Sequence, residues 1–347
     1  MTVVVGMSGG VDSSLSAALL KEQGYTVIGL FMKNWEEADA NGVCMASREY
    51  EDVVRTCDLL QIPCYSVNFV EEYRNRVFDA FLEDLRQGNT PNPDILCNRE
   101  IKFDVFLKKA MDLGADFLAT GHYACLDDQK RLLKGIDPDK DQTYFLHAVR
   151  DFQKVLFPIG HLRKKEVREL ARKFRLPTAE KKDSTGICFI GKRDFKPFVS
   201  QYISYRPGDF QRLNGDVVGR HDGAAYYTIG QRKGLGLGGE GEAWFVIEKD
   251  ISRNIVYVER GENHPELFHD RLVASQFTWI GQPPSLPFRC KAKIRYRQIE
   301  QPCVIDQSTI IFDTPQRAIT PGQAIVFYDG DICLGGATIV SRSRSSL

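Results

Sequence analysis

Apolar strands alternate with amphipathic helices through the first half of the chain. Val3-Val4-Val5 is a short β-branched run, typical of a strand buried on both faces. Residues 15–24 then show a helical pattern that stops at Gly24. The alternation continues with strands expected at 26–32, 63–67 and 115–120, and helices at 47–60, 69–86 and 103–110. It predicts a parallel sheet covered by helices, with ligands bound at the carboxyl ends of the strands.

The pattern changes near residue 198, where short apolar runs begin to follow one another without helices between them. These runs lie at 244–247, 255–258, 273–280, 289–297, 304–305, 310–312, 325–328 and 337–340. Their spacing predicts a small β-barrel or sandwich. A glycine-rich stretch at 223–241 is too apolar for a linker and should be a structured loop near the first domain. We therefore expect an α/β domain over 1–197, a central β-rich domain over 198–264 and a C-terminal β-barrel over 265–347.

The first strand and helix are joined by a turn of small and hydroxyl residues, Gly6-Met7-Ser8-Gly9-Gly10-Val11-Asp12-Ser13-Ser14. Its backbone N–H groups and hydroxyls converge on the positive end of a helix, an arrangement that binds anions and most often phosphate. The Walker pattern requires a lysine in the turn, but the first lysine is Lys21, and the Gly-x-Gly-x-x-Gly spacing is also absent. A Gly-Gly turn alone is more often structural, but the whole string between strand and helix favours a phosphate cradle of another kind, and we expect it to bind ATP. Met32 and residues 120–123 are expected at the same edge of the sheet.

Composition narrows the class of protein but not its partner. Of the 347 residues, 43% are hydrophobic and 27% are charged, which is ordinary for a soluble globular protein of two or three domains. Lys+Arg and Asp+Glu number 46 each, so any nucleic-acid surface must come from local clustering. The first strand begins at Thr2 and no apolar run approaches membrane-spanning length. We expect a cytoplasmic protein with no membrane contact.

Two of the nine cysteines lie in segments with unusual chemistry. An odd number of cysteines without a C-x-x-C pair argues against a disulfide framework or a zinc site, so no metal ligands are expected among them. Cys97 follows a proline-stiffened loop near a helix start, beside Arg99, where a thiol should have a lowered pKa. A buried structural cysteine is the alternative there. Cys188 lies among small polar residues in an accessible loop at 181–191.

Two segments concentrate positive charge. In residues 162–174 the apolar positions should face the core and the six cations solvent, as a solvated helix face or a polyanion contact. These cations are Arg163, Lys164, Lys165, Arg168, Arg172 and Lys173. In residues 289–297, strict alternation puts five cations on one face of a strand. Such a strand either protects a sheet edge or contacts a phosphate backbone.

Several motifs occur in one order along the chain. The first is Ser-Gly-Gly-Val-Asp-Ser at 8–13, which resembles the pyrophosphate loop of ATP pyrophosphatases. The others are Asn-Pro-Asp-x-x-Cys-Asn (92–98), Thr-Gly-His-Tyr-Ala (120–124), Lys-Asp-Gln (140–142), Ser-Thr-Gly-Ile-Cys-Phe-Ile-Gly (184–191) and Thr-Ile-Gly-Gln-Arg-Lys-Gly-Leu (228–235). Together they closely resemble the bacterial tRNA-specific 2-thiouridylases. The resemblance covers nearly the whole chain, and the two cysteine motifs are its most specific part.

The resemblance implies an ATP-dependent enzyme that adenylylates the 2-carbonyl oxygen of the wobble uridine in tRNAs for Lys, Glu and Gln, and then replaces that oxygen by sulfur. Mg²⁺ would assist through Asp12 or the phosphates. Cys188 would carry a persulfide received from a sulfur-relay protein or a cysteine desulfurase, and Cys97 would cleave its S–S bond to leave a Cys97–Cys188 disulfide. Asp94, the nearest carboxylate to Cys97, is a candidate for proton transfer. ATP would be bound by Gly6, Met7, Ser8, Gly9, Gly10, Val11, Asp12, Ser13, Met32 and Gly121.

The same resemblance implies a set of tRNA contacts. They are Asn92, Pro93, Asp94, Lys140, Asp141, Gln142, Arg295 and Tyr296. Strict alternation puts Tyr296 on the apolar face of the cationic strand, so its role requires a bulge or a strand end at that point.

Two other interpretations fit the phosphate cradle. One is another pyrophosphate-loop ligase or amidotransferase, which needs an ammonia source or an amino-acid site and has no use for two exposed loop cysteines. The other is a non-enzymatic ATP-binding sensor, which needs neither thiol nor a basic β-domain.

Overall fold

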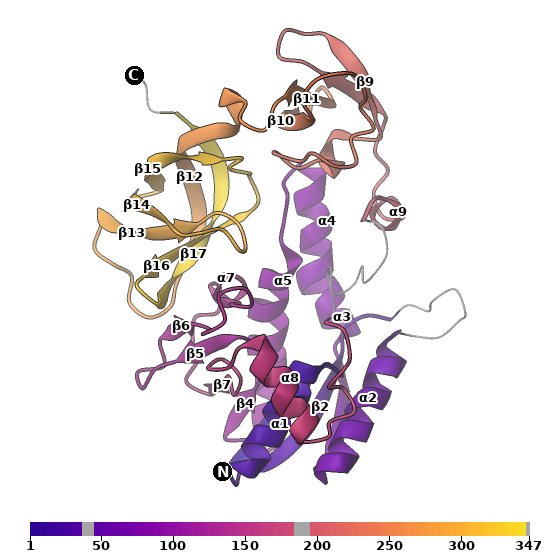
Figure 1. The fold of residues 1–347 in the computed structure, drawn as a ribbon, viewed down its shortest axis with the longest axis vertical. Coiled ribbons are helices and arrows are strands. Elements are labelled where there is room, and N and C mark those ends of the chain that lie inside the picture. Colours follow the sequence, from indigo (N-terminus) through magenta and orange to yellow (C-terminus); the bar gives the residue numbers. More distant parts are fainter. Residues whose placement is uncertain (37–44, 184–194, 345–347) are drawn as a thin grey trace.

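The N-terminal domain is built on a five-stranded parallel sheet, as the alternation of strands and helices predicts. The computed structural model describes residues 1–36, 45–183 and 195–344 (Figure 1). The strands lie in the order β3 (Cys64–Asn68), β2 (Thr26–Lys33), β1 (Thr2–Met7), β4 (Phe117–Ala119) and β7 (Val155–Leu156). The strands β1, β2 and β4 are paired in parallel, so their carboxyl ends meet at one edge.

Helices cover both faces of this sheet. Because side chains alternate along a strand, Val3 and Val5 of β1 face one layer and Val4 faces the other. The first layer contains α1 (Val11–Glu22), α2 (Met45–Leu60) and α8 (Lys164–Lys173), and α1 lies beside α8. The second contains two long helical stretches with π-helical middles. They are α3 (Val70–Tyr73), η1 (Arg74–Phe78) and α4 (Asp79–Arg86), then α5 (Pro93–Leu96), η2 (Cys97–Phe106) and α6 (Leu107–Asp112).

Six strands of the C-terminal domain close into a barrel. Neighbours pair in the order β12 (Phe268–Trp279), β15 (Thr309–Arg317), β14 (Gln301–Asp306), β13 (Phe288–Lys293), β16 (Ala324–Asp329) and β17 (Ile332–Ser343), and β17 pairs again with β12. Closure removes the exposed sheet edges. A hairpin of the N-terminal domain, β5 (Ala124–Leu126) and β6 (Leu132–Lys134), joins the barrel through the pairing of Leu133 with Ile332.

The central domain is a four-stranded sheet in the order β10 (Trp244–Asp250), β11 (Ile255–Arg260), β8 (Gly208–Gln211) and β9 (Val217–His221). The remaining helical elements are short: α7 (Thr143–Leu146), α9 (Phe195–Val199), η3 (Ala224–Tyr226) and η4 (Pro265–Leu267). The glycine-rich stretch does more than pack near the first domain. Tyr226 contacts the large N-terminal core, while Ile229 packs with Phe245 and with Ala318 of the barrel domain.

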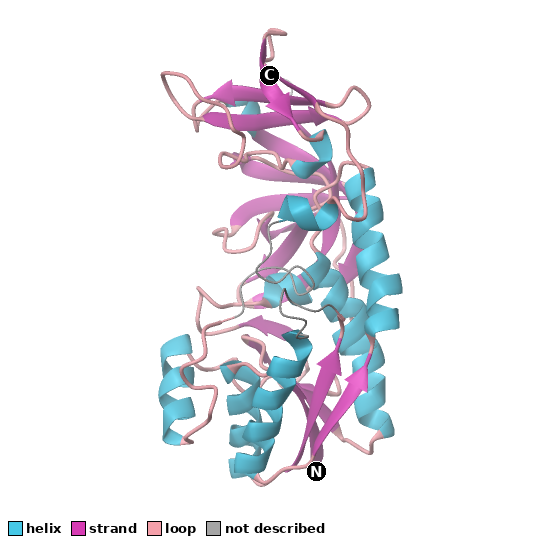
Figure 2. Ribbon diagram, turned by 90° about the vertical axis from the view of Figure 1, so that its right-hand side faces the viewer, coloured by secondary structure: helices cyan, strands magenta, loops and turns pink. Residues whose placement is uncertain are grey.

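Both β-domains lie at one end of the elongated molecule, with the parallel sheet at the other, and α4 rises between them (Figures 1 and 2). Polar contacts fix this arrangement. Lys249 of the central domain donates to the Gly88 carbonyl oxygen beyond α4 (2.7 Å). Lys134 forms an ion pair with Glu300 of the barrel domain (2.6 Å). In the part of the chain that the structure describes, no helix is long and apolar enough to span a bilayer.

Candidate active site

The predicted phosphate cradle lies between β1 and α1. Gly10 is the N-cap of α1 with extended backbone, and within the described residues no side chain caps this helix. The N–H groups of its first turn therefore remain available at the positive end of the helix dipole. Gly9 has φ +71°, and a Cβ there would lie 2.6 Å from the Glu49 carbonyl oxygen. The Ser8 N–H donates to Ser13 Oγ (3.1 Å), which closes the turn.

Gly121 lies directly against this cradle. A Cβ on Gly121 would be 2.8 Å from both the Asp12 carbonyl carbon and the Ser13 amide nitrogen. Met32 lies at the carboxyl end of β2, next to Phe31, which pairs with Met7. The glycine turn, the end of β2 and the residues after β4 therefore lie at one edge of the sheet, as the sequence predicted.

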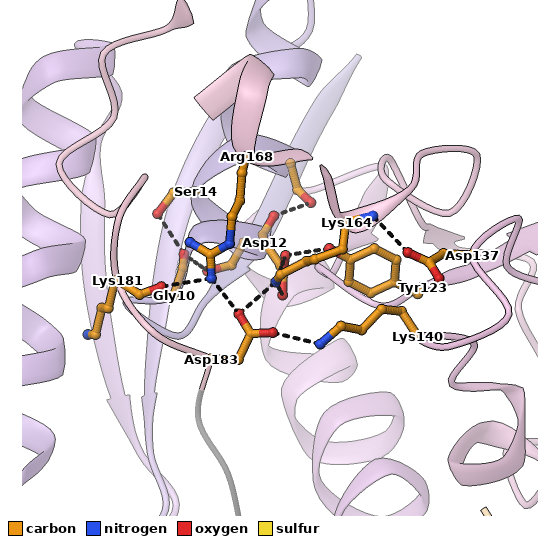
Figure 3. A network of polar contacts seen from close by, with 12 residues as sticks. Gly10, Asp12, Ser14, Tyr123, Asp137, Lys140, Lys164, Arg168, Lys181 and Asp183 are labelled. Atoms are coloured by element: carbon orange, nitrogen blue, oxygen red, sulfur yellow. Dashed lines mark hydrogen bonds and ion pairs between the residues drawn. The ribbon is translucent and has the colours of Figure 1, made fainter. Parts of the chain in front are cut away.

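A network of charged side chains surrounds Asp12 (Figure 3). The Lys164 ammonium donates to both carboxylate oxygens of Asp12, at 2.7 and 2.9 Å, and forms an ion pair with Asp183 at 2.8 Å. The Tyr123 hydroxyl donates to Asp12 Oδ1 (2.7 Å). Burial, together with the Asp12 charge, raises the pKa of Tyr123, so the phenol keeps its proton and remains a donor.

Three cations share the Asp183 carboxylate. Lys140, Lys164 and Arg168 approach it at 2.7, 2.8 and 3.0 Å. Burial opposes ionisation of Asp183, but hydrogen bonds from Lys140 and Lys164 outweigh it and lower its pKa to about 2. Asp183 is therefore ionised at neutral pH and connects Lys140 to the cradle.

The cradle is also held from its other side. The Lys181 ammonium donates to the Gly9 carbonyl oxygen (2.9 Å) and to Asp52 (2.7 Å). Gly9 is thereby fixed between the first turn and the segment that leads to residue 183.

The sequence pattern missed most of this network. It placed all cations of α8 in solvent, which is wrong for Lys164 and Arg168, whose side chains are 14% and 24% exposed. By contrast, the side chain of Lys165, which follows Lys164 in the chain, is 89% exposed, as the pattern predicted. Periodicity assigns the faces of a helix, but it cannot show that α8 packs across α1 and brings two long side chains over Asp12 and Asp183.

Cys97 lies inside a helix rather than in a loop. Asn92 caps α5 by accepting a hydrogen bond from the Asp94 N–H (3.1 Å), and Pro93 takes the first helical position. The helix continues through Cys97, whose side chain is 1% exposed, as a π-helical segment. Of the two alternatives that the sequence left open for Cys97, the structure fits the buried cysteine near a helix start rather than an exposed loop thiol. Cys188, with the rest of its motif, lies outside the described residues.

Asn98, next to Cys97, fixes this part of the helix. Its side-chain amide donates to the Phe145 carbonyl oxygen (3.1 Å), and its Oδ1 accepts from the Lys102 ammonium (2.9 Å). The first of these bonds joins the π-helix η2 to α7, the helix that follows the motif at 140–142. π-Helical turns of this kind are frequent at functional sites.

In the motif at 140–142, Lys140 lies toward the cradle, whereas the polar groups of Asp141 and Gln142 bond to other residues inside the protein. The Lys140 side chain is 30% exposed and pairs with Asp183. Asp141 is 5% exposed, accepts from the Thr143 hydroxyl (2.8 Å) and lies 3.7 Å from the Lys293 ammonium. Gln142 accepts through Oε1 from the N–H of Tyr123 (2.9 Å).

The cationic strand is shorter than strict alternation predicts, because β13 ends at Lys293. Tyr296 therefore lies beyond the strand, as its expected role required, with its ring centroid 4.4 Å from that of Phe145. Arg295 is largely buried and donates to the carbonyl oxygens of Ile229 (3.0 Å) and Ala318 (2.8 Å). It thus connects the glycine-rich stretch to the barrel domain.

The expected face of five unpaired cations is not formed. Lys293 is 14% exposed and lies 3.6 Å from Glu300, and Arg289 pairs with Asp313. Lys291 is exposed. Two of the five cations, Arg289 and Lys293, are thus paired with acidic residues that lie outside the strand, and a pattern within one strand cannot show such partners.

Comparison with known proteins places the chain among tRNA-modifying enzymes. Family models described as tRNA methyl transferase HUP domain, tRNA methyl transferase PRC-barrel domain and Aminomethyltransferase beta-barrel domain match residues 1–192, 196–260 and 269–339. The chain is 62% identical to the tRNA-specific 2-thiouridylase MnmA of Protochlamydia amoebophila, covering 97% of this chain and 93% of that protein. It is 54% identical to the protein of the same name from Bacillus subtilis, with 97% and 94% covered.

A solved 4-thiouridine synthetase–RNA complex with bound ATP is also similar, with a TM-score of 0.36 and 17% identity over 55% of this chain and 46% of that one. Two of the family descriptions mention methyl transfer. Both relatives described above are named 2-thiouridylases, and each match extends over nearly the whole length of both chains.

Proposed function

Because the chain belongs to the tRNA-specific 2-thiouridylase family, we propose that its site performs ATP-dependent 2-thiolation of uridine in tRNA by the route set out below. The observation that supports this route best is the uncapped start of α1, with Gly121 packed against it and the Lys140–Asp183 pair beside it. This arrangement provides an anion site next to a cation of the motif that the resemblance assigns to tRNA.

The residues of the cradle fit ATP. Two glycines, Gly9 and Gly121, stand where a Cβ would meet neighbouring backbone, and the free N–H groups of α1 suit a phosphate chain. The bound set would be Gly6 to Ser13 with Met32 and Gly121. Within the described residues, no group of three or more His, Cys, Asp or Glu side chains could hold a metal ion. Mg²⁺ would assist through Asp12 or through the phosphates.

Activation of the uridine removes the main chemical obstacle, because a carbonyl oxygen is a poor leaving group. The 2-oxygen of the wobble uridine attacks the α-phosphorus, and pyrophosphate departs with the electrons of the broken P–O bond. The oxygen then leaves as part of AMP when sulfur attacks carbon 2. The cradle orients the phosphates for this attack and stabilises the charge that moves to the departing pyrophosphate.

Sulfur reaches the base through the two cysteines. A sulfur-relay protein or a cysteine desulfurase loads Cys188 as a persulfide. Its terminal sulfur attacks the activated carbon, or it is first freed as hydrosulfide. In either order the Cys97 thiolate attacks Sγ of Cys188, the S–S bond breaks, and a Cys97–Cys188 disulfide forms that a thiol reductant must reduce by two electrons. Asp94 is the candidate for accepting the Cys97 proton.

The tRNAs for Lys, Glu and Gln would lie against the helix start at Asn92-Pro93-Asp94, the Lys140 ammonium and the Tyr296 ring. Asp141, Gln142 and Arg295 would act by positioning these contacts, since their polar groups are already used inside the protein. The barrel domain would contact the tRNA beyond the anticodon. We place the protein in the cytoplasm, where its substrate is.

Mass spectrometry of tRNA nucleosides tests this route. The full-length protein is incubated with ATP, unmodified tRNA, a cysteine desulfurase and cysteine. Wild type should convert uridine to 2-thiouridine, while Cys97→Ser and Cys188→Ser should lose the product and keep ATP and tRNA binding. Cys64→Ser, on the edge strand β3, is the matched control. Thiolation retained by either Cys97→Ser or Cys188→Ser would refute the two-thiol route.

A further inference from the structure

The loop that joins α4 to α5, residues 87–92, is held by both β-domains. On the central domain, the Lys249 ammonium donates to the Gly88 carbonyl oxygen (2.7 Å). The Ile251 side chain also packs directly on Gly88, since a Cβ there would lie 2.1 Å from Ile251 Cγ1. Gly88 has φ +80°, a backbone conformation that other residues rarely adopt. The end of α4 thus meets the central domain (Figure 1).

The barrel domain holds the same loop at Thr90, whose two backbone polar groups both bond to it. The Thr90 N–H donates to the Pro321 carbonyl oxygen (3.2 Å), and the Thr90 carbonyl oxygen accepts from the Gln323 side-chain amide. Gly322 lies on Asn89, because a Cβ on Gly322 would be 2.7 Å from Asn89 Cβ and from the Thr90 amide nitrogen. The loop is therefore packed closely on two domains that are remote from it in sequence.

This loop leads directly into residues that the proposed function uses. Asn92 ends the loop and caps α5 by accepting from the Asp94 N–H (3.1 Å). Cys97 follows about one helical turn later. Asn98, the next residue, bonds to Phe145 of the first domain (3.1 Å). The N-terminal domain thus holds the helix from its middle, and the two β-domains hold the loop that precedes it.

From these contacts we infer that the β-domains position Asn92 and Asp94 for 2-thiolation through their hold on residues 88–90. The inference rests on the proposed function, in which these two residues contact the tRNA and Asp94 is the candidate for accepting the Cys97 proton. A displacement of about 1 Å near the reacting groups can lower a rate by about 100-fold. The cradle is built from β1, α1 and the residues after β4, so a shift of this loop should leave ATP binding unchanged.

Gly88→Ala tests this positioning. The added Cβ would push the loop away from Ile251, so the turnover number for 2-thiouridine formation should fall by about 10- to 100-fold, while the dissociation constant for ATP changes by less than about 2-fold. The full-length protein is assayed by mass spectrometry of tRNA nucleosides at saturating ATP and tRNA, and urea unfolding shows that each variant is folded. A purely structural role would lower the free energy of unfolding and leave the turnover number of the folded protein unchanged.

Gly114→Ala is the matched control, because Gly114 has the same φ of +80° but, among the described residues, no atom within 4 Å of the added Cβ. It carries the same kind of backbone strain without moving the loop, so its turnover number should stay at the wild-type value. Ile251→Ala supplies a rescue, since it removes Cγ1 and Cδ1 and leaves its own Cβ at 3.4 Å. Gly88→Ala combined with Ile251→Ala should therefore regain the turnover number of Ile251→Ala alone.

Gly322→Ala repeats the test from the barrel side, with Gly24→Ala as its control. The two glycines have nearly equal φ, +84° and +85°, but the added Cβ meets the loop at Gly322 and no described atom within 4 Å at Gly24. Gly322→Ala should lower the turnover number by a similar factor. Lys249→Met replaces Gly88→Ala if that variant does not fold, because it removes the hydrogen bond to the Gly88 carbonyl oxygen.

A wild-type turnover number in folded Gly88→Ala or Gly322→Ala, or an equal loss in their controls, would overturn the inference. So would a double variant that fails to regain activity, because the loss would then not come from the contact with Ile251. Wild-type protein that makes no 2-thiouridine would instead count against the proposed function itself.

Discussion

Replacing Gly121 by Ala tests the cradle through a single methyl group. The added Cβ would lie 2.8 Å from the Asp12 carbonyl carbon and from the Ser13 amide nitrogen, and 3.1 Å from Asp12 Cβ. Two of these three atoms are backbone atoms, which cannot rotate away as a flexible side chain would. The backbone of Gly121 does not have a left-handed φ, so the effect comes from packing rather than from strain.

The size of the effect follows from the overlap. Forcing an extra methyl group into a well-packed site typically costs about 1–3 kcal/mol. If β4 holds its position, the start of α1 must move, and ATP affinity should fall by about 5- to 150-fold. If residues 120–122 move instead, the cost should appear as lower stability of the free protein, with a smaller loss of affinity.

Two measurements separate these responses: titration with ATP and urea unfolding of the free protein. Gly238→Ala is the control, because no atom lies within 4 Å of the added Cβ and the position has no left-handed φ. It should leave ATP affinity and unfolding unchanged. If Gly121→Ala matched wild type in both measurements, the close packing of Gly121 on the cradle, and the role given to it, would be wrong.

Two further predictions concern the joints between the domains. Burial lowers the pKa of Lys249 to about 8, so between about pH 8 and its ordinary value of 10.5 the unfolded chain binds a proton that the folded chain does not. This group therefore makes the free energy of unfolding rise with pH across that window, by at most about 3.4 kcal/mol. Lys249→Met should remove this rise when urea unfolding is measured across the window. The variant also loses the hydrogen bond to Gly88, which shifts stability at every pH, so the test is the slope with pH, and an identical slope in both proteins would contradict the prediction. Lys293→Gln should lower the free energy of unfolding by about 1–3 kcal/mol, because it leaves the buried Asp141 without its cation. Lys291 is exposed, so Lys291→Gln should leave the free energy of unfolding unchanged. It should instead reduce the salt dependence of tRNA binding by about one phosphate contact. The reverse pattern would return the strand to a simple phosphate-binding role.

The sequence by itself determined the layers of this protein and the place of the glycine turn that we propose as its phosphate cradle. The Val3-Val4-Val5 run, the glycines that follow it and the helical pattern after them are local features, and their physical causes are local as well. A β-branched run prefers a buried strand, and Gly9 supplies a left-handed turn that other residues rarely adopt. The change from a helical to a strand-like hydrophobic pattern near residue 198 likewise predicted the two β-domains from the sequence alone.

Only the tertiary structure decided which charges meet. Asp12, Lys164 and Asp183 are far apart along the chain, and no pattern within one helix shows that α8 crosses α1 and closes this ion-pair network. The same holds for Lys293 and Asp141, which come from different domains. Periodicity records whether a residue faces the core or solvent, whereas the partner of a charge depends on the packing of distant elements. For that reason Lys164 of α8, which the helical pattern places in solvent, instead lies against Asp12 at the proposed phosphate cradle.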